Sequence, residues 1–214
     1  MDKVTRRSFV AAVGAATLVP AAAIAAAAPA ASPAAATPPC EACHGAHGEG
    51  MAAAHVPRIA GQSAEYLKKQ LDDYADGSRD NPIMRNFAKA LSEDQRTRFA
   101  ARYAAMSAPF LAQAAPSNAV LLARGHQLAY QGDEAERVQA CNSCHGPDGV
   151  GIAQGAPYLA GQSAEYLANA LKAFQNGTRK NDAGESMRSV VAHLNDADIA
   201  AVTIYFARVD LSTH

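Results

Sequence analysis

The sequence has few of the residues that usually fill a protein interior. Tryptophan is absent from its 214 residues, and only 6% of them are aromatic. Apolar residues make up 49%, but alanine supplies much of that share. Because protein interiors are close-packed, this composition indicates that something besides the polypeptide, such as a cofactor, helps to fill the core.

An excess of positive charge is lacking as well. The formal net charge is −1 at pH 7, so the chain does not have the basic footprint that nucleic-acid-binding proteins carry. We therefore expect no nucleic-acid partner.

The first 36 residues have the layout of an export signal. The basic start MDKVTRR precedes an uncharged stretch, residues 9–28, and Ala- and Pro-rich sequence follows it. We expect residues 1–36 to be a cleaved signal with a disordered Ala/Pro-rich segment, and the mature protein to lie in the periplasm. Three alternatives stay open. The uncharged stretch could be retained as a membrane helix, or the protein could associate peripherally with the membrane. Export could also follow a twin-arginine route, because TRRSF resembles a twin-arginine signal.

Cysteine is scarce, and all four cysteines lie in two hexapeptides that share the pattern C-x-x-C-H-G. CEACHG occupies residues 40–45, and CNSCHG occupies residues 141–146. Two C-x-x-C pairs can form disulfides, bind structural zinc or act as redox dithiols. None of these uses needs a histidine after each second cysteine, whereas covalent attachment of c-type haem does. The motifs therefore predict two haem c groups, bound covalently by Cys40, Cys43, Cys141 and Cys144.

The chain contains an internal repeat. AGQSAEYL occurs at residues 60–67 and again, letter for letter, at residues 160–167. Such a repeat predicts two tandem domains. We place the first domain at 37–108 and the second at 119–214. The linker between them, 109–118, holds two prolines and no charge.

The local patterns are helical in both domains. Apolar residues recur at three- and four-residue spacing, and no stretch alternates convincingly as a strand would, so the predicted fold is all-α. Three of the predicted helices begin at good N-cap residues. These caps are Ser63, Ser92 and Asn195.

The repeat has one gap. Residues 119–130 predict an apolar helix before the second motif, whereas proline-rich sequence precedes Cys40. We therefore expect the first domain to lack a full leading helix.

Histidine and methionine are the predicted iron ligands. His44 and His145 follow the second cysteine of each motif, where an imidazole can reach the iron as the proximal ligand. The second domain has one methionine, Met187, and Met84 aligns with it in the first domain. We expect these two methionines to be the distal ligands; the alternative is that they only fill the core. Four other histidines have no counterpart in the opposite domain, so we expect them to be packing or surface residues: His47, His55, His126 and His193.

Two further aligned pairs indicate groups that hold the haem. Pro57 and Pro157 follow the proximal histidines by thirteen and twelve residues, and a carbonyl beside each could accept the imidazole N–H. A simple turn is the alternative. Arg79 and Arg179 could pair with haem propionates, or they could be solvated surface residues.

Together these residues resemble class I cytochrome c. The motifs CEACHG and CNSCHGPDGVG carry the likeness, with the later proline, methionine and terminal aromatic helix. The tandem arrangement is similar to dihaem cytochromes of the c-four type over nearly all of residues 37–214. The resemblance implies two all-α domains, each wrapped around one covalently bound haem. It implies the axial ligands His44, Met84, His145 and Met187.

The resemblance also implies a periplasmic one-electron carrier and not an enzyme. Iron closed by histidine and methionine offers no open position to a substrate. The expected partners are redox proteins such as a terminal oxidase or reductase, the cytochrome bc complex or a dehydrogenase. Two alternatives stay open: an electron-transfer subunit of a dehydrogenase complex, and a dihaem enzyme with an open haem site, such as a thiosulfate dehydrogenase.

Overall fold

A computed structural model describes residues 40–108, 118–151 and 155–210 of the chain. These residues belong to a single contact unit, Thr37–His214. The predicted export signal and nearly all of the predicted linker lie outside the described residues. We call residues 40–108 the first half and residues 118–210 the second half.

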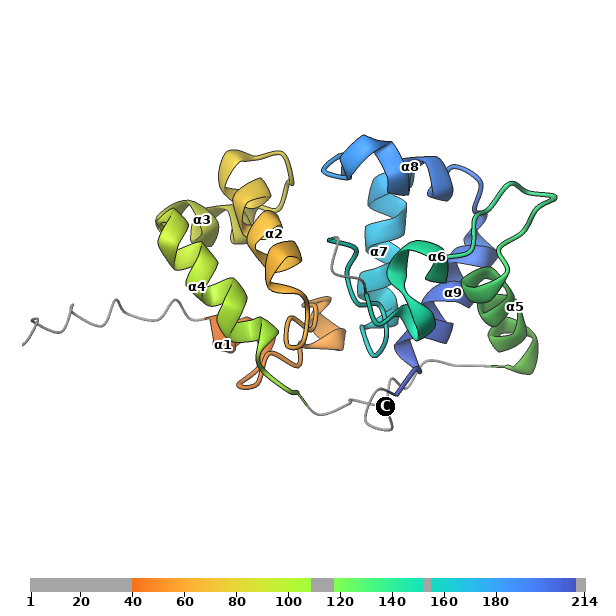
Figure 1. Cartoon of the computed structure of the whole chain (residues 1–214), viewed down its shortest axis with the longest axis horizontal. Coiled ribbons are helices and arrows are strands. Elements are labelled where there is room, and N and C mark those ends of the chain that lie inside the picture. Colours follow the sequence, from red (N-terminus) through yellow and green to blue (C-terminus); the bar gives the residue numbers. More distant parts are fainter. Residues whose placement is uncertain (1–39, 109–117, 152–154, 211–214) are drawn as a thin grey trace, which may run out of the picture. The chain divides into compact units, whose positions relative to one another are not determined.

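The first half is helical, as the sequence predicts. Its helices are α1 (Cys40–His44), α2 (Ala64–Asp76), α3 (Pro82–Ala90) and α4 (Glu93–Ala104), with a 3-10 turn, η1 (Ala52–Ala54), after the first motif (Figure 1).

The second half repeats this order and adds a leading helix. It comprises α5 (Ala119–Tyr130), α6 (Asn142–His145), η2 (Pro147–Gly149), α7 (Ala164–Gln175), η3 (Ala183–Glu185), α8 (Ser186–Val191) and α9 (Asp196–Ala207). The described residues contain isolated bridges but no strand, so the all-α prediction is confirmed.

The helix starts follow the predicted capping chemistry. The Ser63 hydroxyl accepts a hydrogen bond from the Tyr66 backbone N–H at 3.1 Å, which satisfies one of the free donors at the start of α2. Ser92 and Asn195 each form a full capping box, at the starts of α4 and α9. All three predicted caps are therefore confirmed.

The core of the second half is built where α5 packs across α9 (Figure 1). A Cβ atom added to Gly125 would lie 2.3 Å from the Ala201 carbonyl oxygen, so only glycine allows the two helices to approach this closely. The largest fully buried side chains of the described residues belong to this core, and they are Leu128, Val191 and Phe206.

The core of the first half is smaller. Its buried apolar cluster consists of Leu67, Ala100 and Tyr103, with Cys40 and two other partly buried side chains packed against it. No described helix lies across α4 in the way that α5 lies across α9. The sequence before Cys40 is outside the described residues, so the predicted lack of a leading helix stays a prediction.

Candidate functional site

Each cysteine motif lies on a single short helical turn. Cys40 begins α1, and Cys141 is the N-cap residue of α6. None of the four cysteines forms a disulfide; the first cysteine of each motif is half-buried, and the second is exposed. Residues three apart on a helix lie on one face, so both thiols of a motif can meet one edge of a flat ligand.

Burial affects the first cysteine of each motif. It raises the pKa of Cys40, against the opposing effect of the Tyr103 hydroxyl, and it raises the pKa of Cys141 to about 11. Neither Cys40 nor Cys141 therefore has the depressed pKa of a redox-active or catalytic thiol.

The two motifs do not come together as one metal site. Among residues 40–108, 118–151 and 155–210, no group of three or more His, Cys, Asp or Glu side chains is placed to hold a metal ion. All four cysteines belong to these ranges, so the structure gives no support to the structural zinc alternative, which needs four converging ligands.

The histidines of the motifs are buried and held by proline carbonyls. His44 and His145 are each 7% exposed. The Nδ1 atom of His44 is 2.9 Å from the Pro57 carbonyl oxygen, and that of His145 is 2.9 Å from the Pro157 carbonyl oxygen. The predicted contact between each histidine and a carbonyl at the proline is therefore confirmed, so the two prolines do more than form a turn; iron binding by the histidines stays a prediction.

This arrangement leaves Nε2 of each ring available to a metal. Burial lowers the pKa of His44 and of His145, and the carbonyl contacts oppose that effect only in part. Both rings are therefore neutral near pH 7, and a neutral imidazole that donates through Nδ1 presents the lone pair of Nε2.

The loop after each motif follows the same path in both halves. The Gly48 carbonyl accepts hydrogen bonds from the backbone N–H groups of Ile59 and Ala60, and the Gly149 carbonyl accepts the corresponding pair in the second half. A Cβ atom on Gly149 would lie 2.7 Å from the Phe206 ring. Glycine is needed at this position because the loop passes directly against an aromatic ring of the last helix.

The predicted distal ligands, Met84 and Met187, lie in the first turns of corresponding helices, but different side chains fix these two turns. Met84 lies in the first turn of α3, where the Asn81 side chain accepts its backbone N–H at 2.9 Å. Met187 lies in the first turn of α8, beside Arg188, whose backbone N–H and Nε donate to the Asp182 carboxylate at 3.0 and 2.8 Å. Both methionines are half-buried. Their binding to iron stays a prediction.

Arg79 and Arg179 are buried, so the solvated-surface alternative is wrong. Each is 9% exposed. Arg79 donates to Gln70 Oε1 at 2.7 Å and to the Tyr166 hydroxyl at 3.0 Å; Arg179 donates to Gln70 Oε1 at 3.1 Å and to the Tyr66 hydroxyl at 3.4 Å. Within the described residues neither guanidinium has a carboxylate partner at ion-pair distance.

Two glutamines, which were not predicted from the sequence, join the halves. Gln162 Oε1 accepts the Arg58 backbone N–H at 2.9 Å, and Gln162 Nε2 donates to the Arg58 carbonyl at 2.9 Å. Gln62 contacts Tyr158 in the same way, at 3.0 and 2.7 Å. The available signal was the unbroken repeat AGQSAEYL, in which each glutamine precedes the N-cap serine.

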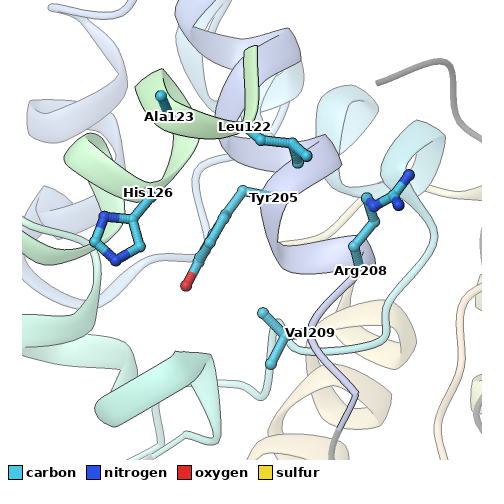
Figure 2. Close-up of a pocket in the computed structure, with 6 residues that line it drawn as sticks. All are labelled: Leu122, Ala123, His126, Tyr205, Arg208 and Val209. Carbon is cyan, nitrogen blue, oxygen red and sulfur yellow. The ribbon is translucent and has the colours of Figure 1, made fainter. Parts of the chain in front are cut away.

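The rival histidines have no common site. His47, His55 and His193 are exposed. His126 stacks on Tyr130, with ring centroids 4.6 Å apart. His126 lines an open hollow of about 400 Å³ together with residues of α5 and of the C-terminal end of α9. Figure 2 shows these side chains around it. No predicted iron ligand lines this hollow, and His126, which is also exposed, packs against Tyr130 there.

Comparisons with known proteins agree with this geometry. The family model for cytochrome c matches the chain twice, over residues 30–107 and 122–210. A thiosulfate dehydrogenase electron acceptor from Stutzerimonas stutzeri (strain A1501) is 45% identical over 170 residues, which cover 79% of this chain and 78% of that protein.

Two solved structures are also similar. The reduced recombinant cytochrome c4 from Pseudomonas stutzeri has a TM-score of 0.73 and 32% identity, over 80% of this chain and 93% of the other. The thiosulfate dehydrogenase TsdBA from Marichromatium purpuratum has a TM-score of 0.75 and 36% identity; the match covers 80% of this chain but 36% of that one. None of the described helices has the length and apolar character required to span a bilayer.

Proposed function

Since the chain belongs to the cytochrome c family, as a c4-like electron carrier with two covalently bound haem c groups, we propose that it shuttles single electrons in the periplasm. The donor is a dehydrogenase or the cytochrome bc complex, and the acceptor is a terminal oxidase or reductase. The observation that carries this proposal is the matched pair of proximal histidines, each fixed through Nδ1 at 2.9 Å from a proline carbonyl.

We assign the haem-binding residues by motif. The thioether bonds come from Cys40, Cys43, Cys141 and Cys144. The iron ligands are His44 and Met84 in the first half, and His145 and Met187 in the second. When bound, each haem supplies a reversible one-electron couple. The protein would orient each imidazole toward the iron, and a methionine as the second protein ligand would leave no position at the iron for a substrate.

The two buried arginines support this assignment. A buried cation without an anionic partner is costly, and neither Arg79 nor Arg179 has a carboxylate at ion-pair distance within the described residues. Haem carries two propionate groups, and a guanidinium matches a carboxylate with two parallel hydrogen bonds. We propose that these arginines meet haem propionates in the holoprotein.

The choice between a carrier and an enzyme depends on the distal methionines. In the oxidised wild-type protein we expect the weak far-red band of methionine-bound ferric haem. Met84→Ala and Met187→Ala should each remove half of that band, whereas Met51→Ala, at a residue 42% exposed, should leave it unchanged.

Carbon monoxide provides the opposing measurement. The reduced wild-type protein should not take it up, because both irons are closed, and the Met84→Ala and Met187→Ala variants should each bind it at one iron. Uptake by the wild-type protein at either iron would favour an enzyme with an open haem site instead.

A similarity at 45% identity to a thiosulfate dehydrogenase electron acceptor supports one donor class in particular. We propose that a thiosulfate-oxidising dehydrogenase can reduce this protein. In stopped-flow mixing with such an enzyme and thiosulfate, haem reduction should be saturable and should require the enzyme. Reduction only by artificial donors would exclude this donor but would leave the carrier function standing.

A further inference from the structure

We propose that Gln62 and Gln162 are positioning residues that tune the haems across the chain: each sets the strength of the proximal-histidine hydrogen bond in the opposite half. The reduction potential of the first haem then depends on Gln162, and that of the second haem on Gln62. This inference rests on the proposed ligation by His44 and His145.

The first step is the connection between each glutamine and a histidine. The Pro57 carbonyl, which contacts His44 Nδ1 at 2.9 Å, belongs to the same peptide group as the Arg58 N–H. That N–H donates to Gln162 Oε1 at 2.9 Å. Imidazole, peptide group and glutamine therefore form one chain of hydrogen bonds, which we call the first relay.

The second relay has the same parts from the opposite halves. His145 Nδ1 is 2.9 Å from the Pro157 carbonyl, and the same peptide group donates its N–H, that of Tyr158, to Gln62 Oε1 at 3.0 Å. Both relays border one small cavity of about 70 Å³. The duplication is an independent sign that the contact is specific, because the two relays use non-identical residues, Arg58 and Tyr158, at the bridged position.

The glutamines are well suited to hold these peptide groups. Gln62 and Gln162 are 6% and 4% exposed, so water does not readily replace the amide. Each uses its oxygen for the peptide N–H and its nitrogen for the next carbonyl. Gln162 Oε1 also accepts the backbone N–H of Ser163 at 3.0 Å, which fixes the amide orientation.

The electronic consequence follows from cooperativity in hydrogen-bond chains. A peptide group that donates through its N–H is a stronger acceptor at its oxygen. A stronger acceptor on Nδ1–H increases the basicity of the ring as a ligand and stabilises the ferric state. Removing the glutamine should therefore weaken the imidazole hydrogen bond and raise the reduction potential of that haem.

The test is a potentiometric titration of the full-length dihaem protein in which each haem is followed separately. The two haems are assigned by NMR of their axial methionine methyl signals, using the Met84→Ala and Met187→Ala variants. Gln162→Leu should raise the midpoint of the first haem and leave that of the second nearly unchanged. Gln62→Leu should do the reverse. Lys69→Ala removes a hydrogen bond between the halves, to the Asn181 carbonyl, without touching either relay, and it should shift neither midpoint.

A conservative variant separates tuning from simple disruption. Gln162→Glu still offers an oxygen to the Arg58 N–H in either protonation state, so it should leave the first midpoint at or below the wild-type value. A structural defect would shift the Leu and Glu variants in the same direction. In the wild-type protein, the Nδ1–H proton of His44 should exchange slowly with solvent, and in Gln162→Leu it should exchange faster.

The outcomes are distinct from those that test the function. If Gln162→Leu shifts the second haem, shifts both haems equally or shifts neither, the relay proposal is wrong. If the wild-type protein lacks histidine and methionine ligation at its irons, the proposed site assignment fails first.

Discussion

The two halves hold their motif histidines in the same way, but among the described residues they differ in what packs on their last helix. In the second half α5 lies across α9, and Gly125 allows that crossing. In the first half the helix aligned with α9 is α4, where Tyr103 corresponds to Phe206. Here the position aligned with Ala201 is Arg98, which is exposed. Within the described residues, His44 is therefore held by its proline carbonyl at the same distance as His145, although no described helix crosses α4.

The largest effect on this difference between the halves should come from a large side chain at the point where α5 crosses α9. Gly125→Leu places a side chain where even a Cβ atom would be 2.3 Å from a backbone oxygen, so α5 must move away from α9. We expect the free energy of unfolding of the second half to fall by about 3 kcal/mol. Circular dichroism during chemical denaturation would measure this as an earlier transition for one half of the helical signal.

Two matched variants sharpen that result. Ala123→Leu changes an exposed position of the same helix, and Arg98→Leu changes an exposed position of α4. Both should alter the free energy of unfolding by less than about 0.5 kcal/mol. A large effect of Arg98→Leu would mean that something covers α4 after all.

A smaller difference concerns the turns that carry the methionines. Burial by itself raises the pKa of Asp182, but the backbone N–H and guanidinium of Arg188 outweigh it, and the net shift is downward. Its stabilising effect is therefore complete above the ordinary aspartate pKa and is lost as pH falls through the lowered value. The corresponding turn in the first half relies on Asn81, which does not titrate.

Acid should therefore loosen the Met187 turn before the Met84 turn. On acidification below about pH 4, the half of the far-red band that depends on Met187 should fade first. Asp182→Asn should remove this acid sensitivity, and Asn81→Asp should create it in the first half. Asp72 titrates in the first half too, but it links α2 to α4 and not the turn that carries Met84. Equal fading of both halves in the wild-type protein would contradict the assignment.

Much of this architecture could be predicted from local sequence. The caps at Ser63, Ser92 and Asn195 depend on a side chain and a backbone N–H three residues away, so a short window contains all the information. The proline carbonyls could be anticipated because the chemistry of a metal-binding imidazole calls for an acceptor at a repeated position.

The remaining features depend on contacts over about a hundred residues. Arg79 looks like any surface arginine until Tyr166 and Gln70 are placed around it. Gln62 and Gln162 could be noticed as part of a perfect repeat. Their partners are backbone groups, however, and every residue type has these, so the sequence does not indicate which residues the glutamines contact. Only the folded arrangement shows which peptide group each amide holds.

The glutamine contacts have a consequence for the history of the chain. Each half has both a glutamine side-chain amide that bonds to the other half and a backbone peptide group that bonds to the other half's glutamine. The contact surface of each half is therefore complementary to a copy of itself. Two identical molecules could make the same pair of contacts around a two-fold axis, as homodimers do. A gene duplication that fused the two subunits of such a dimer would keep the existing interface. Later divergence at positions such as Arg58 and Tyr158 would leave the contacts intact, because the glutamines bind only main-chain atoms of these residues.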